Sequence, residues 1–246
     1  MTVDKLGVKL YDRVYAVIAE LISNSYDADA ENVTVRAPMG QYLATKVGGT
    51  ITSKNLSIEV EDDGSGMSPD ELQDFYLVVG SERRNDHKRG DVAPKFKRKV
   101  MGRKGVGKLA PFGVCRVVEI VSSGGEKIQE GDDEGYRVAH IILDKNGILD
   151  DTSEHYTPAT GDLDSKLSPK TFTRVTLREF DYRRIGAMSE LGRQLSQRFG
   201  LPSENWRVTL ENTSKTSGHP EYSMILGAFQ VPVMANSKIE FSGSKP

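Results

Sequence analysis

Cysteine is almost missing from this sequence. Cys115 is the single cysteine among 246 residues, so an internal disulfide is excluded, and such scarcity is typical of proteins that work in a reducing cytoplasm. Long apolar runs are missing as well, because no stretch approaches the roughly 20 apolar residues that cross a bilayer. The first residues also lack the apolar core of a signal peptide. We therefore expect a cytoplasmic protein without a membrane span.

A large excess of charge of either sign is missing too, since the formal net charge is −2. The charge is nevertheless unevenly distributed: lysines and arginines gather between residues 83 and 104, whereas the remainder of the chain is acidic. This charged segment, punctuated by glycine and proline, is typical of a mobile surface loop. It could simply be solvated, or it could cover a polyanion such as a triphosphate or contact nucleic acid.

Apolar residues make up 37% of the chain, enough for a substantial core in one large domain or in one domain with an appendage. Their spacing predicts an α/β fold. Helices are expected over 11–29, 69–79, 108–113 and 185–199. The second of them begins after Ser68, which forms a candidate capping box with Glu71. Strands are expected over 32–35, 56–61, 115–122, 135–143, 171–180, 206–210 and 224–233. Between them, residues 37–55 predict a hairpin or a disordered insertion, and residues 144–170 predict irregular structure.

A first motif, Glu20-Leu-Ile-Ser-Asn24-Ser-Tyr-Asp27-Ala28, lies in the first long helix. At about 100° per residue, Glu20, Asn24 and Asp27 project from one side, and the apolar residues point the opposite way. Most polar helix faces simply meet water. Here, however, a carboxylate lies one turn from an amide oxygen, which is a hard neutral ligand suited to magnesium. The carboxylate could polarise a water molecule.

A second motif, Asp62-Asp-Gly64-Ser-Gly66-Met67, directly follows a predicted strand. Gly64 and Gly66 permit backbone angles that other residues resist and let the chain approach a ligand closely. A carboxylate held at Asp62 can accept a hydrogen bond from an exocyclic amine such as that of adenine, and Met67 would close the pocket by packing. The alternative is an ordinary Asp-Gly turn without a ligand.

A third motif, Gly102-Arg-Lys104-Gly105-Val106-Gly107-Lys108, contains three glycines. It matches the G-x-x-x-x-G-K part of a P-loop, but the next residue is Leu109, so the hydroxyl that would bind magnesium is missing. The preceding residues are basic, whereas a P-loop follows a buried strand. A glycine-rich turn that leads into a helix still offers backbone N–H groups to phosphate oxygens in any fold.

In this order and spacing, the three motifs resemble the GHKL family of ATPases. That family includes gyrase B, the MutL mismatch-repair proteins, the ninety-kilodalton heat-shock chaperone, MORC proteins and sensor histidine kinases. The resemblance covers roughly residues 10–180 and is closest to the hydrolysing MORC-like and chaperone-like branch. It implies a Bergerat fold, which is a two-layer α/β sandwich with a mixed sheet and helices on one face.

The resemblance also implies a role for each matching residue, with ATP and Mg²⁺ as the bound species. Glu20 corresponds to the general base, Asn24 to the magnesium ligand and Asp62 to the carboxylate that reads adenine. Thr173, in Thr-Arg-Val-Thr-Leu, corresponds to the strand threonine that supports adenine binding. The remaining nucleotide-binding positions are Asp27, Gly64, Gly66, Met67, Gly102, Lys104, Gly105, Val106, Gly107 and Lys108.

By the same resemblance, residues 1–183 form the ATPase core, with a basic ATP lid at about 81–108. Residues 184–246 would be an extension that packs on the core or leads to a transducer domain. In relatives, a basic residue of that domain contacts the terminal phosphate, and lid closure drives dimerisation. We therefore expect slow hydrolysis by this chain alone, a nucleotide-dependent homodimer of a larger protein, and a role in DNA transactions or defence.

Two other functions remain open at this stage. One is a histidine-kinase-type phosphotransfer module, for which the substrate histidine would have to come from another chain, because only about ten residues precede the first long helix. The other is a nucleic-acid-binding protein that uses the basic segment 83–104 and binds nucleotide only for regulation. Transfer of phosphate to a partner would indicate the first, and salt-sensitive DNA binding without nucleotide dependence would indicate the second.

Overall fold

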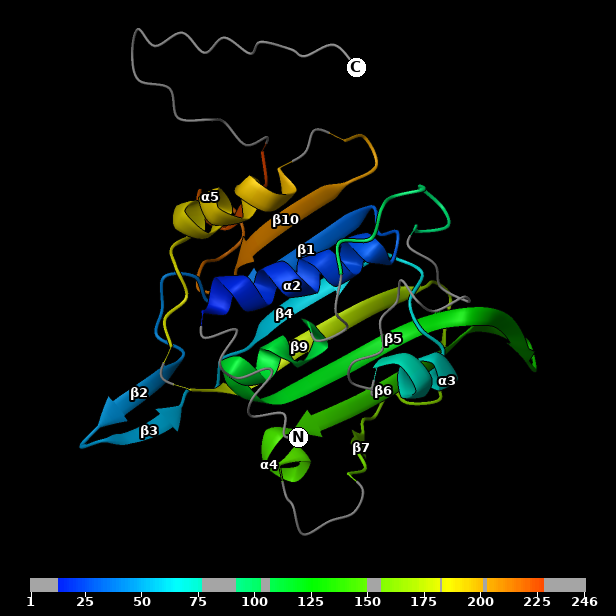
Figure 1. Ribbon diagram of the computed structural model, residues 1–246, viewed down its shortest axis with the longest axis horizontal. Helices are drawn as coiled ribbons and strands as arrows, with labels where there is room; N and C mark the ends of the chain where they lie inside the picture. The colour runs from blue at the N-terminus through cyan, green and yellow to red at the C-terminus, as the bar shows by residue number, and fades with distance from the viewer. Residues whose placement is uncertain are drawn as a thin grey trace, which may run out of the picture.

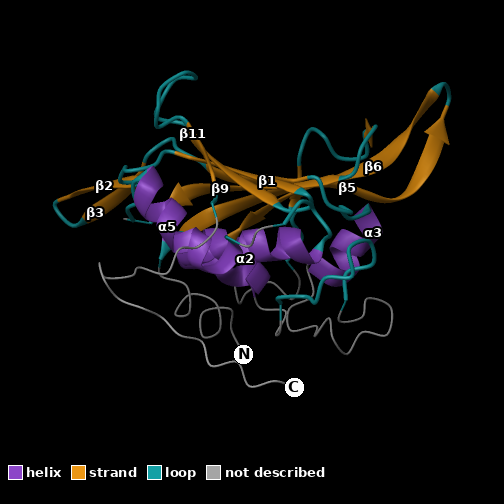
Figure 2. Ribbon diagram, turned by 90° about the horizontal axis from the view of Figure 1, so that it is seen from above, coloured by secondary structure: helices purple, strands orange, loops and turns teal. Residues whose placement is uncertain are grey.

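The chain folds into two layers, a large twisted sheet and a set of helices on one of its faces (Figures 1 and 2). The structure is a computed structural model that describes residues 13–76, 92–102, 107–149, 156–181, 183–200 and 203–227. Figure 2 shows helices α2, α3 and α5 together below the sheet, with no described helix above its centre. This arrangement confirms the predicted α/β sandwich with helices on one face.

The described sheet is mixed, as the fold prediction required, because one pair of its strands is parallel and the others are antiparallel. Among the described residues the sheet has nine strands in the order β11-β10-β1-β4-β9-β5-β6-β7, with β8 beside β6. Strand β10 pairs with β1 in parallel, and the neighbours of β4, β9, β5 and β6 are antiparallel. The strands are β1 Asn32–Ala37, β4 Ile58–Asp62, β5 Cys115–Glu130, β6 Asp133–Asp144, β7 Ala159–Thr160, β8 Leu167–Ser168, β9 Phe172–Phe180, β10 Arg207–Asn212 and β11 Ser223–Ile225.

Helix α2, Val14–Asp27, lies along the middle of the sheet and forms the centre of the core (Figure 1). Its apolar side chains recur every three or four residues, so one stripe of the helix is buried against the strands. These buried residues are Val14, Val17, Ile18, Leu21 and Ile22. Beside it lies α5, Met188–Phe199, whose Leu191, Leu195 and Phe199 are buried in the same core.

Smaller elements follow local sequence signals. The hairpin expected within 37–55 is present as β2, Ala44–Val47, and β3, Thr50–Ser53, which pair outside the large sheet. The predicted capping box is also present, because Ser68 Oγ accepts from the Glu71 amide and Glu71 accepts from the Ser68 amide. Helix α3, Pro69–Glu71, then continues as a π-helical turn, Leu72–Tyr76. The last part of the helix predicted over 69–79 lies outside the described residues.

The helix expected from 108 to 113 is present as a 3₁₀ helix, Gly107–Gly113, because Pro111 has no N–H to donate and favours a short, tight turn. Two other predictions of local structure were wrong in detail. The region 144–170 is not wholly irregular: it contains α4, Lys145–Ile148, and the short strands β7 and β8, which complete the edge beside β6. Strand β5 continues to Glu130, well past the predicted end.

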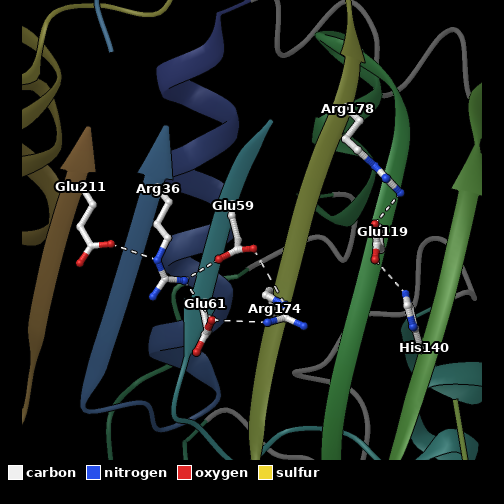
Figure 3. Close-up of polar contacts among 8 residues, drawn as sticks. All are labelled: Arg36, Glu59, Glu61, Glu119, His140, Arg174, Arg178 and Glu211. Atoms are coloured by element: carbon white, nitrogen blue, oxygen red, sulfur yellow. Dashed lines mark hydrogen bonds and ion pairs between the residues drawn. The ribbon is translucent and has the colours of Figure 1, made fainter. Parts of the chain in front are cut away.

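The sheet face opposite the helices is covered by ion pairs (Figure 3). Arg36 on β1 donates to Glu61 on β4 and to Glu211 on β10, each at 3.0 Å, and also to Glu59. Burial by itself would lower the pKa of Arg36, but its hydrogen bonds with Glu59 and Glu61 raise that pKa above its already high ordinary value. Alternating strands can therefore present an apolar face to the helices and a charged face to water.

A second ion-paired group lies on the same face, over β5, β6 and β9 (Figure 3). Glu119 contacts Arg178 and lies 2.9 Å from His140 Nε2. His140 Nδ1 accepts a hydrogen bond from the Leu163 amide, so Nε2 carries the proton that is donated to Glu119.

In the part of the chain that the structure describes, no helix is both long enough and apolar enough to cross a membrane.

Candidate functional site

The second motif lies at the C-terminal half of α2 because β4 ends there at Asp62. The Asp62 side chain is buried, with Oδ2 accepting from Ser25 Oγ at 2.8 Å and Oδ1 accepting from the Gly64 amide at 3.0 Å. Burial raises the pKa of this carboxyl from its ordinary value of 3.8 to about 6, although the two hydrogen bonds oppose the shift. The first two motifs are thus joined through a buried, titratable carboxyl.

Thr173 lies beside this carboxyl because the strand register places it there. Thr173 on β9 is the register partner of Asp62 on β4 and of Ser122 on β5. Ser122 Oγ lies 2.9 Å from Thr173 Oγ1, accepts from the Met67 amide at 2.9 Å and donates to the Phe172 carbonyl at 3.1 Å. These bonds use the full capacity of one hydroxyl, so Ser122 ties Thr173 to the turn of the second motif.

The two glycines of the second motif allow its turn to pack tightly between α2 and β5. Gly66 has φ +63°, and a Cβ there would lie 1.9 Å from the Ser123 carbonyl oxygen. At Gly64 a Cβ would lie 2.7 Å from the Ala28 carbonyl oxygen, which also accepts a hydrogen bond from the next amide in the turn at 2.8 Å. The predicted need for glycine therefore follows from close backbone packing as well as from backbone angle.

The end of α2 also holds the segment that leads into the third motif. Asp27 is buried, and its two carboxylate oxygens accept from the amides of Met101 at 2.6 Å and Gly102 at 2.9 Å. Asp29, in the left-handed region at φ 59°, accepts from the amides of Lys95 at 2.7 Å and Phe96 at 3.2 Å. We call residues 92–102 the lid root. Two carboxylates clamp it to the helix.

Part of the basic segment is used inside the fold. Arg98 is 9% exposed, and its guanidinium donates to backbone carbonyls, including that of Ala30 at 2.7 Å. It also stacks, at 4.5 to 5.4 Å, on the rings of Phe96, Tyr26 and Trp206. Lys95 forms a surface ion pair with Glu31 at 2.6 Å. These two side chains anchor the lid root, whereas residues 81–91 and 103–106 of the predicted lid lie outside the described residues.

Glu20 lies beside the far end of the third motif. Its Oε1 is 3.1 Å from Arg198 Nη1 on α5, and its Oε2 is directed toward Gly107, where a Cβ would lie 2.8 Å away. Asn24, one turn along α2, is exposed. The predicted residues Lys104, Gly105 and Val106 lie outside the described residues, as does the side chain of Lys108. Glu20, Asn24 and Asp27 therefore follow one helix that borders both described ends of the glycine turn.

Magnesium fits this arrangement only together with phosphate. In the ranges that the structure describes, no group of three or more histidine, cysteine, aspartate or glutamate side chains could hold a metal ion. The exposed Asn24 amide is a single hard oxygen ligand, and Mg²⁺ typically takes one or two protein ligands while phosphates and water complete its shell. The donor set is therefore suited to a metal that arrives with a nucleotide.

The cavity of about 490 Å³ at the β5–β6 hairpin is unrelated to these motifs. Its lining residues fall within 130–134 and 165–169, in the hairpin and around the neighbouring strand β8, and none of the three motifs contributes to it. Sequence reasoning overlooked four residues that contact the predicted site residues or the segment leading to them: Ser25, Asp29, Ser122 and Arg198. Only Ser25 and Asp29 had a local signal, since they neighbour the first motif; the other two come from distant strands and helices.

Comparison with known proteins gives one family and two relatives. The family model of histidine kinase-, DNA gyrase B- and HSP90-like ATPases matches residues 11–145, more than half of the chain. HgiDII of Herpetosiphon aurantiacus, a candidate type II restriction enzyme, is 26% identical over 223 residues, which are 90% of this chain. The DNA mismatch repair protein MutL of Clostridium tetani is 31% identical over 75 residues, or 30% of this chain. The matched parts span 32% and 10% of those two proteins.

Proposed function

Because the chain belongs to the family of histidine kinase-, DNA gyrase B- and HSP90-like ATPases, we propose that it binds Mg²⁺-ATP beside α2 and hydrolyses it. One observation carries the proposal: all three motifs meet along a single helix. Ser25 joins the first motif to Asp62 at 2.8 Å, and Asp27 joins it to the Gly102 amide at 2.9 Å. Residues far apart in sequence thus surround one helix face.

In this proposal the base of the nucleotide binds at the buried end of the site. Asp62, when ionised, accepts a hydrogen bond from the exocyclic amine of adenine, while Thr173 and Ser122 hold the neighbouring polar row. Burial makes such a contact selective, because a buried acceptor left without a donor costs more than the same group in water. Bases without an amine at that position should therefore bind more weakly.

At the other end, the chain orients the water that attacks the terminal phosphate. Asn24 would hold Mg²⁺, which when bound neutralises phosphate charge, and Glu20 would orient or deprotonate the water. Backbone amides of the glycine turn 102–108, with the Lys104 and Lys108 side chains, would stabilise the phosphate oxygens. Asp27 would act through the lid root by fixing the Gly102 amide.

A binding and turnover experiment tests this assignment. Glu20→Ala should keep its affinity for a non-hydrolysable ATP analogue in calorimetry, whereas phosphate release should fall by on the order of 10²- to 10⁴-fold. Asn24→Ala should instead abolish magnesium-dependent binding. Unaltered turnover in Glu20→Ala would exclude its role as the base, and a wild-type chain that ignores ATP would exclude the whole proposal.

We further propose that the nucleotide cycle closes the lid at about 81–108 and drives dimerisation of a larger protein. The clamp formed by Asp27 and Asp29 supports this, because it would give the lid segments on either side of the lid root a fixed anchor. Residues 1–183 would form the ATPase core, and 184–246 an extension whose α5 and β10 pack on it. Sedimentation with and without the ATP analogue tests the proposal: a mass that stays monomeric at every nucleotide state would contradict it.

A role in DNA transactions or defence is also proposed, in the MORC-like and chaperone-like hydrolysing branch. It is supported by the names of the two relatives, since mismatch repair and restriction both concern DNA. Because Arg98 is buried and Lys95 is paired, any DNA contact would use other basic residues of 83–104. DNA affinity should fall steeply with salt and respond to ATP.

The single buried Cys115, whose thiol pKa is raised by burial, suits the proposed reducing cytoplasm.

A further inference from the structure

Arg198 contacts the side chain that is proposed as the catalytic base. It lies in the last turn of α5, and its Nη1 is 3.1 Å from Glu20 Oε1. Glu20 Oε2 lies beside Gly107 at the end of the glycine turn, where a Cβ would be 2.8 Å from it. The two oxygens of one carboxylate therefore differ: one is held by a cation and the other is directed toward the proposed phosphate site.

The helix that carries Arg198 is itself fixed. Leu195 and Phe199 flank Arg198 in sequence and are 1% and 2% exposed. Earlier in α5, Gly192 packs against β11 so closely that a Cβ there would lie 2.1 Å from Met224 Cε. Because α5 is wedged between α2 and the β10–β11 end of the sheet, the guanidinium has a defined position relative to Glu20.

We infer that Arg198 is a positioning residue for Glu20, which holds Oε1 so that Oε2 is the oxygen presented to the attacking water. The inference rests on the proposed function. In that step the water oxygen bonds to the terminal phosphorus, the bond from phosphorus to the ADP oxygen breaks, and the water proton passes to Oε2. Without Arg198 the carboxylate can rotate, and a misplacement of about 1 Å can lower a rate by 10²-fold.

If the ion pair between Glu20 and Arg198 served only to stabilise the fold, loss of Arg198 would lower the thermal midpoint of unfolding. Glu20 and Arg198 side chains are 19% and 43% exposed, and ion pairs that reach solvent contribute little to folding stability. Loss of the arginine should therefore leave the thermal midpoint close to that of the wild type. A change in turnover without a change in stability would come from orientation of Glu20.

The test measures phosphate release and nucleotide binding by the full chain with Mg²⁺-ATP. Arg198→Ala should lower kcat by roughly 10- to 100-fold, with KM and affinity for a non-hydrolysable ATP analogue unchanged. Arg198→Lys should recover part of the rate, because it keeps the charge and a donor. Arg193→Ala is the matched control, since Arg193 is exposed on the same helix. In a Glu20→Gln background, Arg198→Ala should have no further effect.

Several results would overturn the inference. Wild-type kcat in Arg198→Ala would exclude positioning, and a raised KM with weaker analogue binding would mean that Arg198 contacts phosphate instead. An equal rate loss in Arg193→Ala would indicate a general disturbance of α5. Failure of the proposed function would look different: the wild type would release no phosphate, or Glu20→Gln would turn over normally. Either result would remove the base on which Arg198 acts.

Discussion

Titration of Asp62 should change nucleotide affinity and folding stability in opposite directions. Its pKa is about 6 in the folded chain and 3.8 ordinarily. Only the ionised carboxylate is a full acceptor for an amine, so ADP affinity should fall by about tenfold per pH unit below pH 6. We expect roughly tenfold weaker binding at about pH 5 than at about pH 7, measured by calorimetry with Mg²⁺ in excess.

The pH dependence of folding stability has the opposite sign to that of nucleotide affinity. Because the folded state binds the Asp62 proton more tightly than the unfolded state, the stabilisation is complete below pH 3.8 and is lost as the pH rises through 6. A shift from 3.8 to about 6 corresponds to about 3 kcal/mol in the free energy of unfolding. The ionised carboxylate is thus tolerated at neutral pH at a cost in stability, which binding of an amine would offset.

Asp62→Asn separates the two effects. The amide has the same shape, its oxygen can accept from Gly64, and its nitrogen can donate to Ser25 Oγ, which can itself donate to the Leu21 carbonyl at 3.2 Å. At about pH 7 the variant should be more stable than the wild type by about 1 to 3 kcal/mol in urea unfolding, and near pH 4 the difference should vanish. ADP binding should be lost at both.

A stability difference between Asp62→Asn and the wild type that is the same at both pH values would refute the raised pKa of Asp62. A wild-type ADP affinity that is flat between about pH 5 and pH 7 would refute the role of its carboxylate as acceptor. Phosphate groups of the nucleotide also titrate, so the comparison uses any residual binding by Asp62→Asn as the control. A residual affinity that follows the same pH dependence would assign the titration to the ligand.

Three further predictions concern single substitutions, two of them with a matched control. Gly66→Ala should lower the free energy of unfolding by about 3 kcal/mol or more, because its Cβ would lie 1.9 Å from the Ser123 oxygen. The control is Gly40→Ala, which is also at positive φ but has no atom within 4 Å of its Cβ. This variant should lose only about 1 to 2 kcal/mol. Arg36→Ala should lower the free energy of unfolding by about 1 to 2 kcal/mol, because three glutamates lose their shared cation. The loss should be smaller at an ionic strength of about 1 M. A loss of stability that salt does not change would contradict this explanation. Asp29→Ala should speed amide exchange across the lid root, and Asp29→Asn, which keeps one of the two acceptor oxygens, should speed it less. Equal exchange in the two variants would contradict the clamp.

Much of the fold is encoded in short stretches of the sequence. The apolar stripe of α2 recurs within one helix, and the alternation in β4 and β9 sorts buried from charged positions within a few residues. The capping box at Ser68 needs residues only three apart. Such signals can be read directly because hydrophobic periodicity and turn chemistry depend on neighbours along the chain. The three motifs of the site were found in the same way.

The tertiary structure decided which of these residues meet. Ser25 and Asp62 are 37 positions apart, and Glu20 and Arg198 are 178 apart. Whether they touch depends on strand register and on where α5 packs. Likewise, Ser122 reaches Thr173 only through the pairing of β5 with β9. The sequence by itself determined the main helices and strands and the chemical groups of the motifs, whereas contact between distant groups required the sheet, because many weak packing interactions together set the register.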